Sequence, residues 1–167
     1  RAAREFVANH GAGLHYSSVN PGLVLGRALD RDIGTSVEII RQFLKGKYPG
    51  APRMSIACVD VRDVARMHRL ALELSAPSGG RYLGAADSLW LIDIARALRE
   101  RLGDAARRVP SRELPDWAVK LVGLFDPAAR MAVPELGKHL RVDASRTRRA
   151  LGIEFIPATE AVAETGR

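Results

Sequence analysis

The sequence contains one cysteine, Cys58, so no disulfide can form within the chain. This scarcity is typical of proteins from a reducing compartment. No secretory signal is evident, and the apolar runs are far shorter than the ~20 residues of a membrane span. We therefore expect a cytoplasmic protein without a membrane partner, in which Cys58 serves as a small buried apolar residue.

Aromatic residues are also scarce, at 5% of a chain whose hydrophobic fraction is 47%, so the core should be aliphatic. The net charge of +7 allows binding to nucleic acid or to anionic cofactors. However, the arginines are spread along the expected helices rather than set in a basic stripe, and few aromatics are available for base stacking. Both observations favour a solvated arginine-rich surface, including Arg146, Arg148 and Arg149, over a nucleic-acid partner.

The four histidines stand apart, without cysteine or carboxylate partners at ligand spacing, so no metal site is expected. His68 falls on an apolar helical face and is interpreted as a core histidine bonded to the backbone. Asp60 and Asp63 form a carboxylate pair of the kind used in acid–base catalysis. Their place at the start of an expected helix favours capping instead, with Asp60 as the N-cap and Asp63 completing the pair.

The apolar periodicity predicts alternating strands and helices. Residues 1–10 have helical spacing but no N-cap, so we expect this helix to begin upstream and the chain to be the C-terminal part of a longer protein. A buried strand over residues 14–19 should end at Asn20-Pro21-Gly22, since proline cannot donate to a ladder. Two further strands are expected within 53–61 and 79–86. Helices are expected within 34–46, 60–75, 89–103, 116–125, 140–152 and 155–166. The order indicates an α/β fold with a parallel sheet first and a smaller mixed lobe after it.

Four stretches resemble the C-terminal half of the extended short-chain dehydrogenases/reductases. They are VNPGLVLG, ACVDVRDVARMHRLALE, GGRYLGAADSLWLIDIARAL and LRVDASRTRRALGIEFIPATEAVAET. Within the NAD-dependent epimerase/dehydratase family, the chain is most similar to the dihydroflavonol reductase-like and aldehyde reductase-like branch.

The resemblance implies the C-terminal part of a Rossmann-like doubly wound parallel sheet, joined to a small mixed α/β substrate lobe. Residues 1–30 would be the end of the dinucleotide-binding domain. Residues 31–167 would be mostly the substrate-binding lobe, with 54–76 and 80–102 returning to the sheet and its helices.

The resemblance also implies a cofactor, NADP or NAD, beside the bend that follows the first strand. Asn20, Pro21, Gly22, Leu23 and Val24 would pass the nicotinamide ring, with backbone groups of Leu23 and Val24 meeting its carboxamide. Gly22 would permit close approach and Pro21 would offer an apolar plane. The alternative is a plain strand-ending turn, without any ligand.

In this family, a Tyr-x-x-x-Lys pair would lie just upstream of Arg1, and a glycine-rich phosphate loop further upstream. Tyr16, Tyr48 and Tyr82 have no lysine four residues later, and no glycine-rich string replaces the loop. We therefore expect no catalytic residue in this chain and no activity from it alone. Its expected partners are the missing N-terminal half of the same fold, a small carbonyl substrate and, as an open alternative, a second copy in a homodimer.

The segment 116–125 is an apolar helix, expected to be capped by Asp116. Its Trp117, Leu121 and Phe125 are interpreted as core packing, as a wall of the substrate pocket, or as a membrane-surface contact. Ile33 and Ser36 are candidate substrate-lining residues from the other side, although Ser36 and its neighbour Thr35 are better suited to capping a helix.

Taken together, these features predict the C-terminal portion of an NAD(P)-dependent oxidoreductase that reduces a ketone or an aldehyde by hydride transfer. Two alternatives remain open at this point. One is a non-catalytic NAD(P)-binding regulatory relative, and the other, less favoured, is a basic nucleic-acid-binding domain.

Overall fold

The computed structural model describes residues 2–11, 13–28, 34–74 and 80–167. The helices are α1 Ala2–His10, α2 Thr35–Leu44, α3 Val61–Glu73, α4 Leu91–Leu102, α5 Asp116–Val122, α6 Pro127–Ala132, α7 Ser145–Leu151 and α8 Ala158–Gly166. The strands are β1 Ser17–Pro21, β2 Leu23–Leu25, β3 Ala51–Pro52, β4 Ser55–Asp60, β5 Gly80–Gly84, β6 Asp87–Trp90 and β7 Glu113–Leu114. The predicted α/β class is confirmed.

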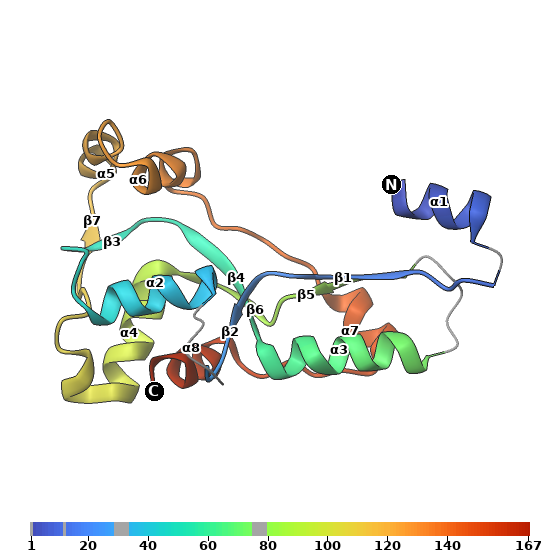
Figure 1. Cartoon of the computed structure of the whole chain (residues 1–167). Helices are drawn as coiled ribbons and strands as arrows, with labels where there is room; N and C mark the ends of the chain where they lie inside the picture. The colour runs from blue at the N-terminus through green and yellow to red at the C-terminus, as the bar shows by residue number, and fades with distance from the viewer. Residues whose placement is uncertain (1, 12, 29–33, 75–79) are drawn as a thin grey trace.

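The strands form small sheets in which parallel pairing dominates. β1 pairs with β5 and β3 with β7, both in parallel. In the largest sheet, of order β2-β4-β6, β4 pairs in parallel with β2 and antiparallel with β6. Figure 1 shows β1 leading into β2 near the middle of the molecule, so that one continuous segment joins two of the sheets.

The first strand lies further along the chain than expected, because β1 begins at Ser17 and includes Pro21. Neighbouring residues of a strand direct their N–H groups to opposite edges. The N–H of Gly22 donates to the carbonyl of Gly84 in β5, at 2.8 Å. The missing N–H of Pro21 therefore falls on the other edge, where no described strand pairs with β1, and the proline costs the ladder nothing.

Two clusters of buried side chains lie at opposite ends of the molecule. The smaller joins α3, β5 and α7 through Met67, Tyr82, Leu151 and Ile153. The larger joins α2, α4, α8, β2 and β4 and is mainly aliphatic, as expected. It contains Leu25, Ile40, Phe43, Ala51, Cys58, Leu91, Ile94, Ala95, Ala97, Leu98, Ala106, Val109, Ala158, Ala161 and Val162.

The buried face of α3 differs from the predicted one. The apolar spacing of residues 60–75 predicts a buried face made of Val61, Val64, Ala65, His68, Ala71 and Leu72. Leu72 is 86% exposed, Val61, Ala65 and His68 are also exposed, and Val64 and Ala71 are half-buried. The expected backbone contact of His68 is present, with Nδ1 2.8 Å from the Val64 carbonyl oxygen. The helix instead buries Asp63 and Met67, and the Asp63 carboxylate accepts the Ile156 N–H.

Three predicted caps also differ from those in the structure. Asp60 is the N-cap of α3, as expected, and accepts from the Arg62 N–H, whereas Asp63 does not complete a capping pair. The N-cap of α2 is Gly34, so Thr35 and Ser36 lie inside its first turn. Asp116 is the first residue of α5 rather than its cap, and its carboxylate binds the Arg53 guanidinium at 2.8 Å.

Candidate functional site

Residues 20–24 occupy the point where the chain passes from one sheet to the other. A Cβ on Gly22 would lie 2.4 Å from the carbonyl oxygen of Ala57 in β4, which is closer than atoms pack. Only glycine therefore fits between β1 and β2. We expected Gly22 to make room for a ligand, and the structure shows that the backbone of β4 already requires a glycine there.

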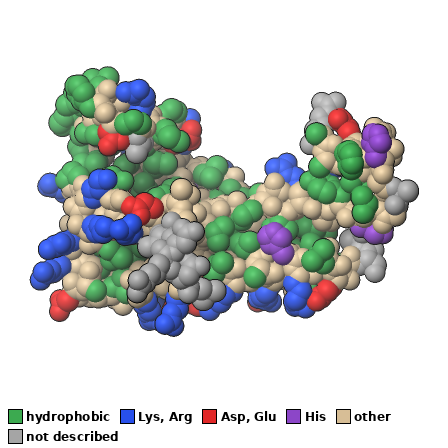
Figure 2. All heavy atoms as spheres, viewed as in Figure 1, with side chains coloured by type: hydrophobic (Ala, Val, Ile, Leu, Met, Phe, Trp, Pro, Cys, Tyr) green, Lys and Arg blue, Asp and Glu red, His purple; other side chains and the backbone are tan. Residues whose placement is uncertain are grey.

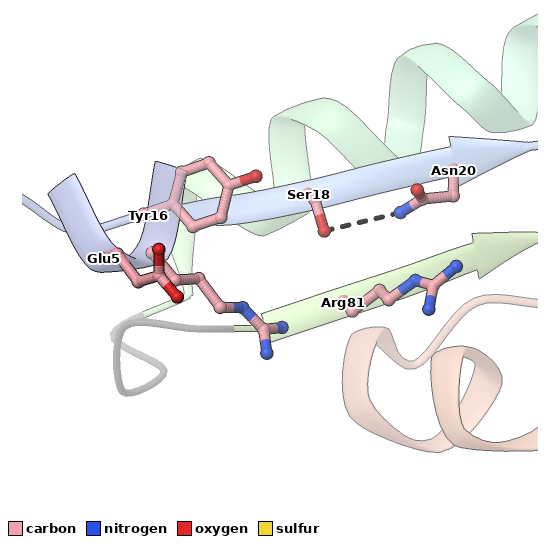
Figure 3. A pocket seen from close by; sticks show the side chains of 6 residues that line it. Glu5, Tyr16, Ser18, Asn20 and Arg81 are labelled. Atoms are coloured by element: carbon pink, nitrogen blue, oxygen red, sulfur yellow. Dashed lines mark hydrogen bonds between the residues drawn. The ribbon is translucent and has the colours of Figure 1, made fainter. Parts of the chain in front are cut away.

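One face of β1 is hollowed into a polar cavity of about 570 Å³. Figure 3 shows Ser18 and Asn20 on this face of β1, with Arg81 on the same face of the neighbouring strand β5. Asn20 Nδ2 donates to Ser18 Oγ at 3.4 Å. The cavity is lined by Arg4, Glu5, Tyr16, Ser18, Asn20 and Arg81.

The opposite face of β1 borders a second cavity, of about 530 Å³, between the strand and the end of α3. Val19 from β1 and Ala71, Leu72 and Leu74 from the other side make much of its wall apolar. The strand thus has a hollow on each face and, in the described part of the chain, a partner along only one edge.

At the other end of the bend, β2 runs beside β4 and stops at Gly26. Leu25 is buried and lies opposite Asp60 in the parallel register. Gly26 has a φ of 141°, and a Cβ there would lie 2.7 Å from Val61 Cγ1, so this position also requires glycine. The Gly26 N–H donates to the Thr165 hydroxyl of α8 at 2.7 Å.

Two buried carboxylates beside the end of β2 have pKa values shifted in opposite directions. Burial raises the pKa of Asp60, but hydrogen bonds from the side chain and N–H of Arg62 outweigh it and leave the pKa below its ordinary value. Asp63 accepts the Ile156 N–H at 2.7 Å, yet burial dominates and raises its pKa. Both carboxylates are thus engaged by neighbouring groups and serve the structure.

Cys58 does not provide a nucleophile. Its side chain is fully buried in β4, and burial raises the pKa of its thiol to about 12, so the reactive thiolate does not form at neutral pH. The expectation of a small buried apolar residue is confirmed. Among the described residues, no group of three or more histidine, cysteine or acidic side chains is placed to hold a metal ion.

The candidate substrate-lining residues lie away from both cavities beside β1. Trp117, Leu121 and Phe125 are 68%, 54% and 85% exposed, so core packing is the wrong interpretation for them. They belong to α5 and the turn after it, which form the apolar lobe at the upper left of Figure 2. Ser36 is half-buried in the first turn of α2, and Ile33 lies outside the described residues.

Sequence reasoning missed Arg81 and Thr165, which the structure places at the cavity and at the end of β2. Arg81 precedes Tyr82 in a strand, so the two-residue period of a strand predicts opposite faces for them. That signal was available. Thr165 carried no signal, because its contact with Gly26 joins residues 139 positions apart.

Comparisons with known proteins agree with the resemblance noted in the sequence. The chain is 38% identical to the ketoreductase azaE of Aspergillus niger over 124 residues, which are 70% of the chain and 37% of that protein. It is 35% identical to a cinnamoyl-CoA reductase of Oryza sativa over 88 residues, which are 53% of the chain and 26% of that protein. No protein-family model matches the chain.

Among solved structures, the chain is similar to yeast methylglyoxal/isovaleraldehyde reductase Gre2, determined in complex with NADPH. The TM-score is 0.72 at 18% identity, covering 98% of the chain and 46% of Gre2. The chain thus spans less than half the length of each of these proteins. No described helix is long and apolar enough to cross a bilayer. The chain belongs to the extended short-chain dehydrogenase/reductase family, within the epimerase/dehydratase group, and covers part of that family's fold.

Proposed function

We propose that this chain is the C-terminal portion of a cytoplasmic NAD(P)-dependent oxidoreductase that reduces a ketone or an aldehyde. The observation that carries the proposal is the path of residues 20–24. The chain leaves the parallel β1-β5 sheet at Pro21 and enters the mixed β2-β4-β6 sheet at Leu23, beside its parallel neighbour β4, with only Gly22 between them. In α/β proteins, ligands bind outside the carboxyl ends of the parallel strands, and residues 20 and 21 are that end of β1. The likeness to a ketoreductase over 70% of the chain supports the same function.

The residues at this bend fit a nicotinamide group. Pro21 is exposed and offers one face of its apolar ring. No described strand pairs with the second edge of β2. Because neighbouring strand residues direct their backbone groups to opposite edges, one of Leu23 and Val24 directs its N–H and C=O there, while the other faces β4. A carboxamide carries one donor group and one acceptor group, so it can form hydrogen bonds with a free strand edge in the way that a neighbouring strand does. The Asn20 side chain adds a donor and an acceptor beside it.

A bound nicotinamide cofactor would supply the hydride. In this proposal Pro21 and Gly22 form the floor under the ring, while Leu23 and Val24 fix its carboxamide and thereby its rotation. The polar cavity beside Asn20 leads away from this floor along β1. Ser36, Trp117, Leu121, Phe125 and, outside the described residues, Ile33 would border the substrate. Their largely apolar character suits a carbonyl compound with an apolar or aromatic body.

The proton donor and the phosphate-binding loop would come from the remainder of the fold. In this proposal that remainder would pack along the edge of β1 that has no described partner and over the hollows on its faces. Phe6, Leu14 and Leu72 are 60%, 58% and 86% exposed around them, and so much uncovered apolar surface is unusual for a finished domain. We therefore expect this chain to have no activity on its own.

The test compares this chain with the intact polypeptide encoded by its gene. NADPH and NADH binding are measured by cofactor fluorescence, and carbonyl reduction by the loss of cofactor absorbance. We expect the intact polypeptide to bind one cofactor and to reduce carbonyl compounds, and the chain alone to do neither. Binding without reduction by the intact polypeptide indicates the non-catalytic regulatory relative instead. Absence of cofactor binding contradicts the proposal.

A further inference from the structure

The C-terminal segment 153–166 is joined to the elements around the bend by three polar contacts. The Ile156 N–H donates to Asp63 Oδ2 at 2.7 Å, at the start of α3. Glu160 lies 3.3 Å from the Arg62 guanidinium, and the Thr165 hydroxyl accepts from the Gly26 N–H at 2.7 Å. Figure 1 shows α8 beside the end of β2. The segment therefore reaches the bend from a part of the chain that is remote in sequence.

The last of these contacts is fixed in orientation. The Thr165 hydroxyl donates its proton to the Ala161 carbonyl of its own helix at 2.7 Å, which leaves an oxygen lone pair for the Gly26 N–H. The helix itself cannot shift easily, because Ala158, Ala161, Val162 and Ala163 are buried. A rigid helix with an oriented acceptor thus holds a buried backbone N–H.

The element that Thr165 holds is short, and its core anchor is Leu25, which is buried in the larger cluster. β2 has three residues and pairs with β4 along one edge in the described structure. Its start is fixed by the close approach of Gly22 to Ala57, and its end by Thr165. A three-residue strand with one paired edge is short enough that its ends determine its register and tilt.

We propose that Thr165 is a positioning residue for the cofactor: by holding Gly26, it sets where β2 presents the backbone of Leu23 and Val24 to the nicotinamide carboxamide. This inference rests on the proposed function. Thr165 acts through Gly26 and touches neither cofactor nor substrate. Gly26 has to be glycine and has no side chain. Its backbone N–H is therefore the only hydrogen-bond donor that this residue can offer to α8.

The experiment compares Thr165→Val with Thr165→Ser in the intact polypeptide. Valine has nearly the same shape as threonine but cannot accept the Gly26 N–H, whereas serine keeps the hydroxyl. We expect Thr165→Val to weaken NADPH binding about tenfold, the size expected for one lost hydrogen bond to a buried N–H. We expect Thr165→Ser to bind within about twofold of wild type.

A second readout does not depend on the cofactor. Amide hydrogen exchange is measured on the same proteins without NADPH. In Thr165→Val, the amides of residues 23–26 should exchange about tenfold faster, while those of β4 keep their wild-type rates. A general loss of stability would instead speed exchange throughout both strands, so this pattern separates positioning from a merely structural role.

Thr159→Val is the matched control. Thr159 is an exposed threonine on the same helix, so its substitution should change neither NADPH binding nor exchange in β2. If Thr165→Val yields too little folded protein, Thr165→Ala removes the same acceptor without adding an apolar branch. It is expected to behave in the same way.

The outcomes distinguish this inference from the function on which it rests. If the wild-type polypeptide binds neither NADPH nor NADH, the proposed function fails and the positioning role fails with it. If wild type binds and Thr165→Val binds equally well, only the positioning role is wrong. The same conclusion follows if Thr165→Ser is as impaired as Thr165→Val, because the hydroxyl would then not be the group that matters.

Discussion

The two ends of the molecule differ in how completely they bury their apolar side chains. At one end, the α4–α8 region (α2, α4, α8, β2, β4 and β6) encloses Ile40, Phe43, Ile94 and Leu98, each with at most 1% of its surface exposed. At the other end, the β1–β5 region (α1, α3, α7, β1 and β5) has a core of only four buried residues. Its helix α1 buries none at all.

The hollows follow the same division. Both cavities border β1, and Phe6, Leu14 and Leu72 are exposed around them. The α4–α8 region encloses its apolar side chains, whereas the described β1–β5 region leaves one edge of β1 unpaired and apolar side chains exposed.

The largest expected effect tests this contrast directly with two leucine-to-alanine substitutions. Leu98→Ala in α4 removes a fully buried side chain and should lower the free energy of unfolding by about 2–5 kcal/mol. Leu72→Ala in α3 removes one that is 86% exposed and should change it by less than about 0.5 kcal/mol. Urea unfolding of the chain measures both. Similar losses for the two variants would contradict the division into a closed and an open end.

The next effect concerns the junction between the two regions. Gly22→Ala forces a Cβ against the Ala57 carbonyl and should cost about 1–3 kcal/mol of unfolding free energy. Gly34→Ala is the control, because a Cβ there meets nothing within 4 Å and its φ of −60° suits alanine. We expect this control to stay within about 1 kcal/mol of wild type in the same urea titration. Equal losses would show that the close approach at Gly22 is not what requires glycine.

Sequence patterns predicted the α4–α8 region better than the β1–β5 region, for a physical reason. The apolar period of residues 89–103 predicts Leu91, Ile94, Ala95, Leu98 and Leu102 as buried. The first four are buried and Leu102 is half-buried, because this helix packs against α8 and the sheet within the chain. The same reasoning applied to α3 placed His68 and Leu72 in the core, where neither lies. An apolar period shows that a face is suited to burial, and burial also requires a partner.

The candidate site was predictable only in part. The stretch Asn20-Pro21-Gly22 correctly indicated that the chain changes direction at a sheet. That Gly22 packs on Ala57, and that Thr165 holds Gly26, depend on residues far away in sequence. The cap at Asp60 was predictable because its partner is two residues away, whereas the partner of Asp63 is 93 residues away.

A smaller effect should appear in the pH dependence of stability at the joint between the regions. Asp63 has a raised pKa in the folded state, so its stabilising contribution is present in acid and is lost as pH rises through that pKa. Asp60 has a lowered pKa, so its contribution is present above its ordinary value of 3.8 and is lost as pH falls. The two neighbours should therefore respond to pH in opposite directions.

Asparagine substitutions measure these two contributions, and each keeps an acceptor oxygen, so the changes should be smaller than for Gly22→Ala. Between acid and neutral pH, Asp63→Asn should gain stability relative to wild type, whereas Asp60→Asn should lose it. Thermal unfolding across that pH range gives both differences. If the stabilities of the two variants change with pH in the same direction, then burial does not raise the pKa of Asp63 while the Arg62 hydrogen bonds lower that of Asp60.

The smallest effect on stability is expected at the apolar surface of α5 and the turn after it. This surface is a third kind of region, because it is exposed but lies away from β1. Phe125→Ser removes a side chain that is 85% exposed, so the unfolding free energy of the chain should change by less than about 0.5 kcal/mol. In the intact polypeptide, the same substitution should raise KM for an apolar carbonyl substrate and leave NADPH binding unchanged, because a pocket wall contacts the substrate alone. Val119→Ser, at a buried position of the same helix, should instead destabilise the protein. If Phe125→Ser leaves KM unchanged as well, the aromatic ring borders no substrate, and the exposed surface of α5 has to be separated from the proposed site.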